Sequence, residues 1–173
     1  MPHIQPTYYA AIIAAEAIGN NNANGVVRAV ELALDHPRLA GYAFYEGGEK
    51  EKKKLTKMLL INSQAYFVNG TTDDGSEIEK PSARTRRGYV HVDFQFLTGR
   101  NNHSLFAPPP PPQRMKVKRL SIAHADDTSG LSWGGQTYET SDGLVRGELR
   151  VEEGDVGGGV DLSDTEAILI LFQ

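Results

Sequence analysis

Two different periods of apolar and polar residues run along the chain. Residues 8–18 are rich in good helix formers, and Pro6 suits the first turn of a helix. Gly19 and the asparagines that follow it are a strong stop signal. Alanine fills the positions between the larger apolar side chains, so the pattern predicts a helix that is apolar on nearly every side.

Beyond Gly25 apolar residues alternate with polar ones, and turn signals become frequent. The clearest alternation is at 89–97, where the even-numbered residues are all Val or Phe and share one face of a predicted strand. Strands are expected at 26–34, 39–45, 55–61, 65–68, 89–97, 115–123, 136–139, 145–151 and 168–172. About eight to nine short strands predict a mainly β domain, a Greek-key-like antiparallel β-sandwich preceded by one N-terminal α-helix.

The helix and the strands suggest two units of organisation. A helix that is apolar on nearly every side needs burial on more than one side, whereas a short sandwich covers only one. We therefore expect residues 1–24 to belong with a larger neighbouring domain and residues 25–173 to form the β-sandwich. The length of 173 residues fits one domain, or one domain plus a fragment of another.

Composition argues against several classes of function. The net charge of −4 argues against a nucleic-acid partner, which usually needs a basic surface. No run approaches the roughly 18 apolar residues of a membrane span, and no signal-peptide pattern precedes the helix. There is no cysteine, so disulfides and thiolate chemistry are excluded. The basic run Lys50–Lys57 fits a solvated loop that leads into a strand.

The residues that could carry chemistry do not form a recognisable site. None of the five histidines has the spacing of a zinc site, and the metal candidate at 124–127 is explained more simply by an Asx turn. A glycosidase needs two carboxylates about 5–10 Å apart across a cleft. The glutamates considered for this role, all in turns or polar strands, are Glu46, Glu139, Glu148, Glu152, Glu153 and Glu166. We therefore expect no catalytic residue, no metal and no cofactor.

Trp133, the only tryptophan, lies between two short predicted strands and close to Tyr138. The two rings could stack on sugars. Trp and Tyr also bury large areas while their polar tips form hydrogen bonds, so a position in the core is the other interpretation and the favoured one.

Six short motifs follow one another over most of the chain. They are 8–11 (Tyr-Tyr-Ala-Ala), 15–19 (Ala-Glu-Ala-Ile-Gly), 40–46 (Ala-Gly-Tyr-Ala-Phe-Tyr-Glu), 60–63 (Leu-Ile-Asn-Ser), 118–120 (Lys-Arg-Leu) and 133–139 (Trp-Gly-Gly-Gln-Thr-Tyr-Glu). Together, and in this order, they resemble the C-terminal portion of fungal glycoside hydrolases of family 79, the β-glucuronidase and heparanase-like group.

In such enzymes a (β/α)8 barrel carries the acid/base and nucleophile glutamates, and a β-sandwich built partly from the C-terminus packs beside it. The resemblance implies that 6–19 is the last barrel helix and 25–173 the accessory β-domain of a parent expected to be extracellular. Two sequons, at Asn69 and Asn102, give weak support for secretion. Both catalytic glutamates would lie upstream of Met1. The departures from the family pattern are a charged insertion at 49–57, a long loop at 71–88 and the prolines at 108–112.

The sequence therefore predicts a non-catalytic accessory domain that packs against and stabilises a catalytic (β/α)8 barrel. Its contacts with the barrel are expected from Tyr8, Tyr9, Ile12 and Ile13. The alternatives are a stand-alone carbohydrate-binding module that uses Trp133 and Tyr138, or a diverged gene remnant. Hydrolysis by the chain itself is the least supported hypothesis.

Overall fold

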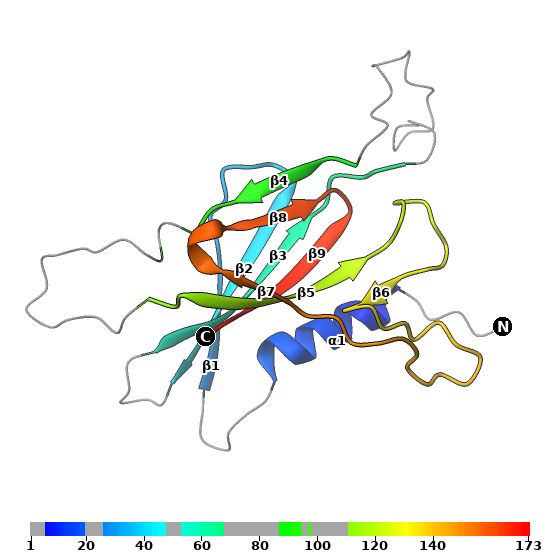
Figure 1. The fold of residues 1–173 in the computed structure, drawn as a ribbon, viewed down its shortest axis with the longest axis horizontal. Coiled ribbons are helices and arrows are strands. Elements are labelled where there is room, and N and C mark those ends of the chain that lie inside the picture. Colours follow the sequence, from blue (N-terminus) through cyan, green and yellow to red (C-terminus); the bar gives the residue numbers. More distant parts are fainter. Residues whose placement is uncertain (1–5, 20–25, 48–52, 68–86, 95–96, 98–110) are drawn as a thin grey trace, which may run out of the picture.

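The computed structural model describes residues 6–19, 26–47, 53–67, 87–94, 97 and 111–173. Helix α1 (Pro6–Ile18) comes first, and a 3-10 turn, η1 (Val156–Gly158), lies between the seventh and eighth strands (Figure 1). The strands are β1 (Val26–Glu31), β2 (Leu39–Gly47), β3 (Lys54–Asn62), β4 (Tyr89–Val92), β5 (Arg114–Ser121), β6 (Ser132–Trp133), β7 (Glu152–Asp155), β8 (Val160–Ser163) and β9 (Glu166–Phe172). Both sequons lie outside the described residues.

All strand pairs are antiparallel. The larger sheet has the order β1-β2-β3-β9-β5-β6, with β7 also paired to β5, and β4 pairs with β8 in a second, two-stranded sheet. Figure 1 shows α1 along one side of the larger sheet and the β4–β8 pair on the other. The predicted mainly β, antiparallel, sandwich-like domain with one N-terminal helix is therefore confirmed.

Strand β9 lies at the centre of the larger sheet, and nearly all of its residues are buried. Ile168, Ile170 and Phe172 point to one side and pack with β3, β5 and β8 in a first core. Leu169 and Leu171 point to the other side and pack in a second core with α1, β2 and β6. Burying each such side chain contributes about 1.5–3 kcal/mol to stability. Because its alternate residues enter different cores, β9 joins the two cores.

The turn between β8 and β9 has an unusual backbone. Thr165 has a φ of 56°, in the left-handed region that β-branched residues rarely adopt. Its N–H and its hydroxyl both donate to the carbonyl of Gln64, at 2.8 and 3.1 Å. The hydroxyl oxygen in turn accepts the N–H of Tyr66 at 2.9 Å. These bonds hold the turn against the end of β3.

Several predicted strands are wrong. Residues 65–67, 136–139 and 145–151 form no strand, and only isolated bridges occur there, between Gln136 and Trp133 and between Thr137 and Arg146. The backbone there is too tightly turned for a ladder: Gly147 has a φ of 94°, and a Cβ on it would collide with the carbonyl of Gly135. Conversely β6, β7 and β8 were not expected, because they are short and β7 lies in a glycine-rich segment.

Helix α1 covers the second core with one face only. Tyr9, Ile13 and Ala17, spaced by four residues, are its buried residues. The Tyr9 hydroxyl donates to the carbonyl of Leu131 at 2.8 Å and accepts the N–H of Tyr138 at 2.9 Å. This side chain therefore joins the helix to the segments on either side of Trp133.

Two lysines of the sheet fix the helix at its C-terminal end. The Lys57 ammonium donates to the carbonyls of Glu16, Ala17 and Gly19 at 3.0–3.3 Å. A cation at this end satisfies unpaired carbonyls and complements the helix dipole. The Lys118 ammonium binds the Glu16 carboxylate at 2.7 and 3.0 Å. Lys57, expected in a solvated run, is therefore a structural residue.

Replacing Tyr9 by phenylalanine should lower the free energy of unfolding. The variant keeps the ring but leaves the Leu131 carbonyl and the Tyr138 N–H without their partner, at a cost of about 1–3 kcal/mol. Urea denaturation of the full chain measures the change. Tyr8→Phe is the matched control, because Tyr8 is 46% exposed and should leave the midpoint unchanged. Equal midpoints for wild type and Tyr9→Phe would contradict the proposed anchoring role.

Candidate functional site

The outer face of α1 is apolar and uncovered. Tyr8 is 46% and Ile18 55% exposed, and the alanines at 10, 11, 14 and 15 are exposed between them. Of the residues expected to contact a further domain, Tyr9 and Ile13 are instead buried against the chain's own sheet, and Ile12 is half-buried. Of these four residues only Tyr8 is exposed, because the helix turns Tyr9, Ile12 and Ile13 toward the second core.

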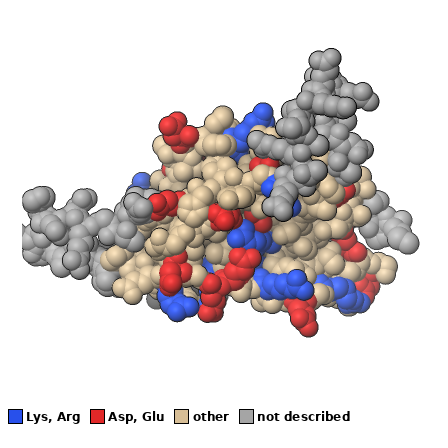
Figure 2. Space-filling model, turned by 45° about the horizontal axis from the view of Figure 1, so that its top comes forward, with Lys and Arg blue, Asp and Glu red and all other residues tan. Residues whose placement is uncertain are grey.

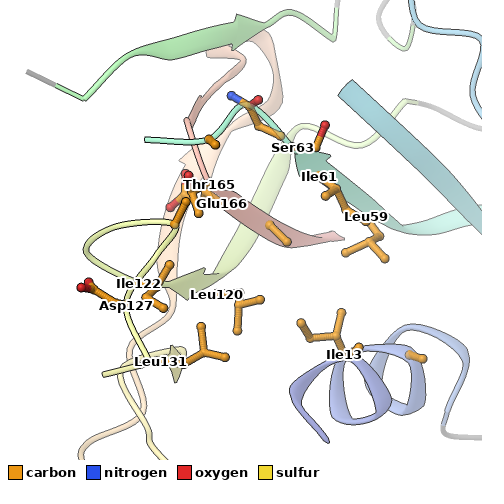
Figure 3. Close-up of a pocket in the computed structure, with 16 residues that line it drawn as sticks. Ile13, Leu59, Ile61, Ser63, Leu120, Ile122, Asp127, Leu131, Thr165 and Glu166 are labelled. Carbon is orange, nitrogen blue, oxygen red and sulfur yellow. The ribbon is translucent and has the colours of Figure 1, made fainter. Parts of the chain in front are cut away.

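An apolar groove opens beside this helix (Figure 3). Its volume is about 480 Å³, and its walls come from α1, the ends of β3 and β5, and the start of β9. Ile13, Leu59, Leu120 and Leu131 line it, with the polar groups of Thr165 and Glu166 at one end. The groove extends the apolar surface of α1 toward the ends of the inner strands β3, β5 and β9. Sequence patterns missed it, because residues from four separate segments form it.

Three tyrosines form an aromatic cluster at the N-terminal half of α1. The Tyr138 ring lies edge-on to Tyr8 and Tyr9, with centroids 5.5 and 5.8 Å away. Burial, with Tyr8 and Glu16 nearby, raises the pKa of the Tyr138 phenol. The ring is half-buried, and Tyr8 and Tyr9 contact it edge-on.

Trp133 is completely buried in the second core. The Lys118 ammonium lies 4.9 Å from its ring centroid, in a cation–π contact. A sugar cannot reach the ring in this arrangement. The burial of the ring agrees with the core interpretation, but the buried indole N–H has no hydrogen-bond partner among the described residues.

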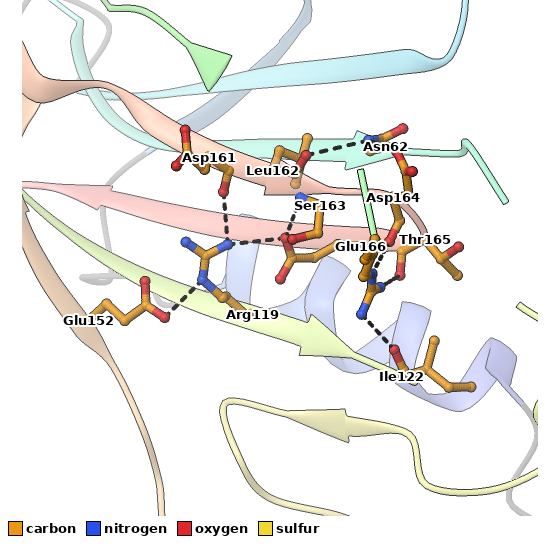
Figure 4. Close-up of polar contacts among 11 residues, drawn as sticks. Asn62, Arg119, Ile122, Glu152, Asp161, Leu162, Ser163, Asp164, Thr165 and Glu166 are labelled. Atoms are coloured by element: carbon orange, nitrogen blue, oxygen red, sulfur yellow. Dashed lines mark hydrogen bonds and ion pairs between the residues drawn. The ribbon is translucent and has the colours of Figure 1, made fainter. Parts of the chain in front are cut away.

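The glutamates serve as structural acceptors. Arg119 donates to Glu152 at 2.9 Å and to Glu166 at 3.1 Å (Figure 4), and Glu166 also accepts the N–H of Ser163. Burial alone would lower the pKa of Arg119, but these carboxylates raise it. Glu139 accepts the N–H groups of Gly130 and Leu131, and Glu46 and Glu153 pair with lysine or arginine. Glu148 is exposed.

The face shown in Figure 2 carries interspersed positive and negative side chains, and neither sign forms a continuous patch. Among the described residues, no three His, Cys, Asp or Glu side chains are grouped to hold a metal ion. At the metal candidate, the Asp127 carboxylate accepts the N–H of His124 at 2.8 Å, as in a local turn. Within the described part of the chain, no helix is both long and apolar enough to cross a bilayer.

A comparison with protein families decides the identity of the fold. The family described as "Glycosyl hydrolase family 79 C-terminal beta domain" matches residues 41–169. The chain belongs to this family. The match begins within β2 and ends within β9, so it covers both sheets and leaves α1 and β1 outside. A search of curated proteins found no match.

Family membership agrees with the sequence resemblance and gives the β-domain a context. The family is named for the C-terminal domain of glycosyl hydrolases. The described residues of this family 79 β-domain contain paired, structural carboxylates, an apolar helix face and an apolar groove.

Trp133 fluorescence should report a buried ring. We expect a blue-shifted emission maximum, slow quenching by acrylamide, and no shift on titration with glucuronide or glucan oligosaccharides, because the ring is fully covered. The chain has a single tryptophan, so the signal has one source. A red-shifted, easily quenched emission that responds to sugar would contradict this placement.

Proposed function

We propose that this chain is a non-catalytic accessory domain that packs against and stabilises a catalytic (β/α)8 barrel of a family 79 glycosyl hydrolase. The observation that carries the proposal is the uncovered apolar face of α1 on a domain of this family. Apolar surface of this kind, continuous and on an ordered element, usually marks a contact with another protein surface.

The position of α1 supports the barrel as the partner. The helix lies outside the family match and uses one face for the β-domain. Its other face, with Tyr8 and Ile18, has the small and apolar residues that allow another helix or strand to approach closely. The groove at Ile13 and Leu59 adds apolar surface next to it.

The arrangement of the carboxylates supports a non-catalytic role. A retaining or inverting glycosidase needs an acid and a second carboxylate facing a sugar-binding cleft. Glu152 and Glu166 share one guanidinium, and Glu139 is held by backbone N–H groups. Each of these side chains already has a structural partner. Hydrolysis of a chromogenic glucuronide by the purified chain would overturn this part of the proposal.

Charged substitutions on the outer face of α1 should weaken binding to the barrel. Tyr8→Glu places a negative charge near the N-terminus of the helix, and Ile18→Lys places a positive charge at its C-terminus. Both charges interact favourably with the helix dipole, so the helix should still form. Burying an isoleucine contributes about 1.5–3 kcal/mol, so each change should weaken binding by roughly tenfold or more. Calorimetric titration of the full chain into a family 79 barrel that lacks its own β-domain measures this affinity.

Val30→Lys is the matched control. Val30 is 37% exposed on the edge strand β1, where lysine is well tolerated, and should leave the affinity unchanged. Two results would contradict the proposal: no complex at micromolar concentrations, or wild-type affinity in both helix variants.

A further inference from the structure

A second, polar hollow lies on the other side of Asn62 from the apolar groove. Its volume is about 460 Å³, a size within the range of small-molecule sites. It lies where the start of β4 meets the β8–β9 turn and the end of β3. Tyr89, Gln64, Arg87 and Asp164 line it together with His36.

The base of this hollow is fixed by hydrogen bonds. The Arg87 guanidinium donates to the backbone carbonyls of Ile122, Asp164 and Thr165 at 2.6–2.9 Å. Asn62 donates to one oxygen of the Asp164 carboxylate at 3.3 Å, and the N–H of Gly88 donates to the other at 3.1 Å. Figure 4 shows Asn62 and Asp164 facing each other at the turn.

Counted over the described residues, the fixed groups keep hydrogen-bonding capacity. A guanidinium has five N–H donors, of which Arg87 uses three on these carbonyls. Each oxygen of a carboxylate can accept two bonds, and each oxygen of Asp164 accepts one of those named above. The Gln64 amide adds a planar donor and acceptor, since its own bond, to the Ala65 carbonyl, is long at 3.4 Å. Donors and acceptors therefore stand side by side.

An aromatic ring stands at the rim. Tyr89 is 65% exposed, the highest value among the large hydrophobic side chains that the structure describes as exposed. Its position on β4 is exposed, whereas Val90 and Val92 are half-buried, with Val90 lining the hollow and Val92 packing against the first core. A tyrosine offers a broad apolar face at a small cost in side-chain entropy, which suits it to stacking.

The chemistry of these groups selects a ligand class. A ligand should have one apolar face for Tyr89 and several hydroxyls for the planar polar groups of Gln64, Arg87 and Asp164. The charges of Arg87 and Asp164 offset each other, so no net charge attracts an ion. We propose that this hollow, the Tyr89 pocket, binds a neutral sugar residue, with the C–H face of the ring on Tyr89 and its hydroxyls on the polar base.

Saturation-transfer NMR of the full chain tests this with cellotetraose, a neutral glucan, and glucuronic acid, an acidic sugar. We expect saturation of cellotetraose ring protons, and weaker or no saturation of glucuronic acid. Tyr89→Ala should weaken cellotetraose binding by roughly tenfold, the equivalent of about 1.4 kcal/mol lost on removal of the stacking face. Gln64→Ala should weaken it less.

Leu144→Ala is the control, because Leu144 is exposed, lines neither cavity and should leave sugar binding unchanged. Far-UV circular dichroism checks that each variant is folded. No saturation of cellotetraose at millimolar concentration overturns the proposal, as does equal binding by wild type and a folded Tyr89→Ala. Preferential binding of glucuronic acid also overturns it, since the site would then select an anion. None of these results depends on barrel binding.

Discussion

The structure depends on the burial of strand β9 on both of its faces. Alternate residues from Ala167 to Phe172 enter two different cores, and β3 and β5 flank the strand on its two edges. A strand buried on both faces is usually a feature of sheets covered by helices on each side. Here a helix covers one face and a two-stranded sheet covers the other. Every element that carries a candidate function is anchored to this strand directly or through one neighbour.

The helix α1 is held to the sheet by polar contacts as much as by burial. The Tyr9 hydroxyl, Lys57 and Lys118 each bridge the helix to a different segment. Such contacts fix the rotation of the helix about its own axis, which apolar contacts with alanine would leave loosely specified. The orientation of the outer face, with Tyr8 and Ile18, is therefore determined by the inner face.

The sequence allowed the class of the fold to be predicted, but not the details of the site. The helix formers at 8–18, with a stop signal at Gly19, predicted α1 well. The residue patterns at 39–45 and 55–61 predicted β2 and β3. The segment after Trp133 misled the prediction, since Val145 to Val151 has strand-like residues but is exposed and tightly turned. The Tyr89 pocket could not be predicted, because its residues come from four segments that only tertiary packing brings together.

The turn at Thr165 affects the register in which β9 pairs with β3 and β5. Sliding a strand by one residue normally moves apolar side chains into water, and this cost selects the correct alignment. In β9 the residues on both faces are apolar, so a slipped alignment from Ala167 onward would still bury hydrocarbon on each side. The correct alignment must then be selected at the turn. There the N–H of Thr165 donates to the carbonyl of Gln64, and the carbonyl of Thr165 accepts a hydrogen bond from Arg87. A few polar bonds thus decide between folded arrangements that hydrophobic burial alone would leave nearly equal in energy.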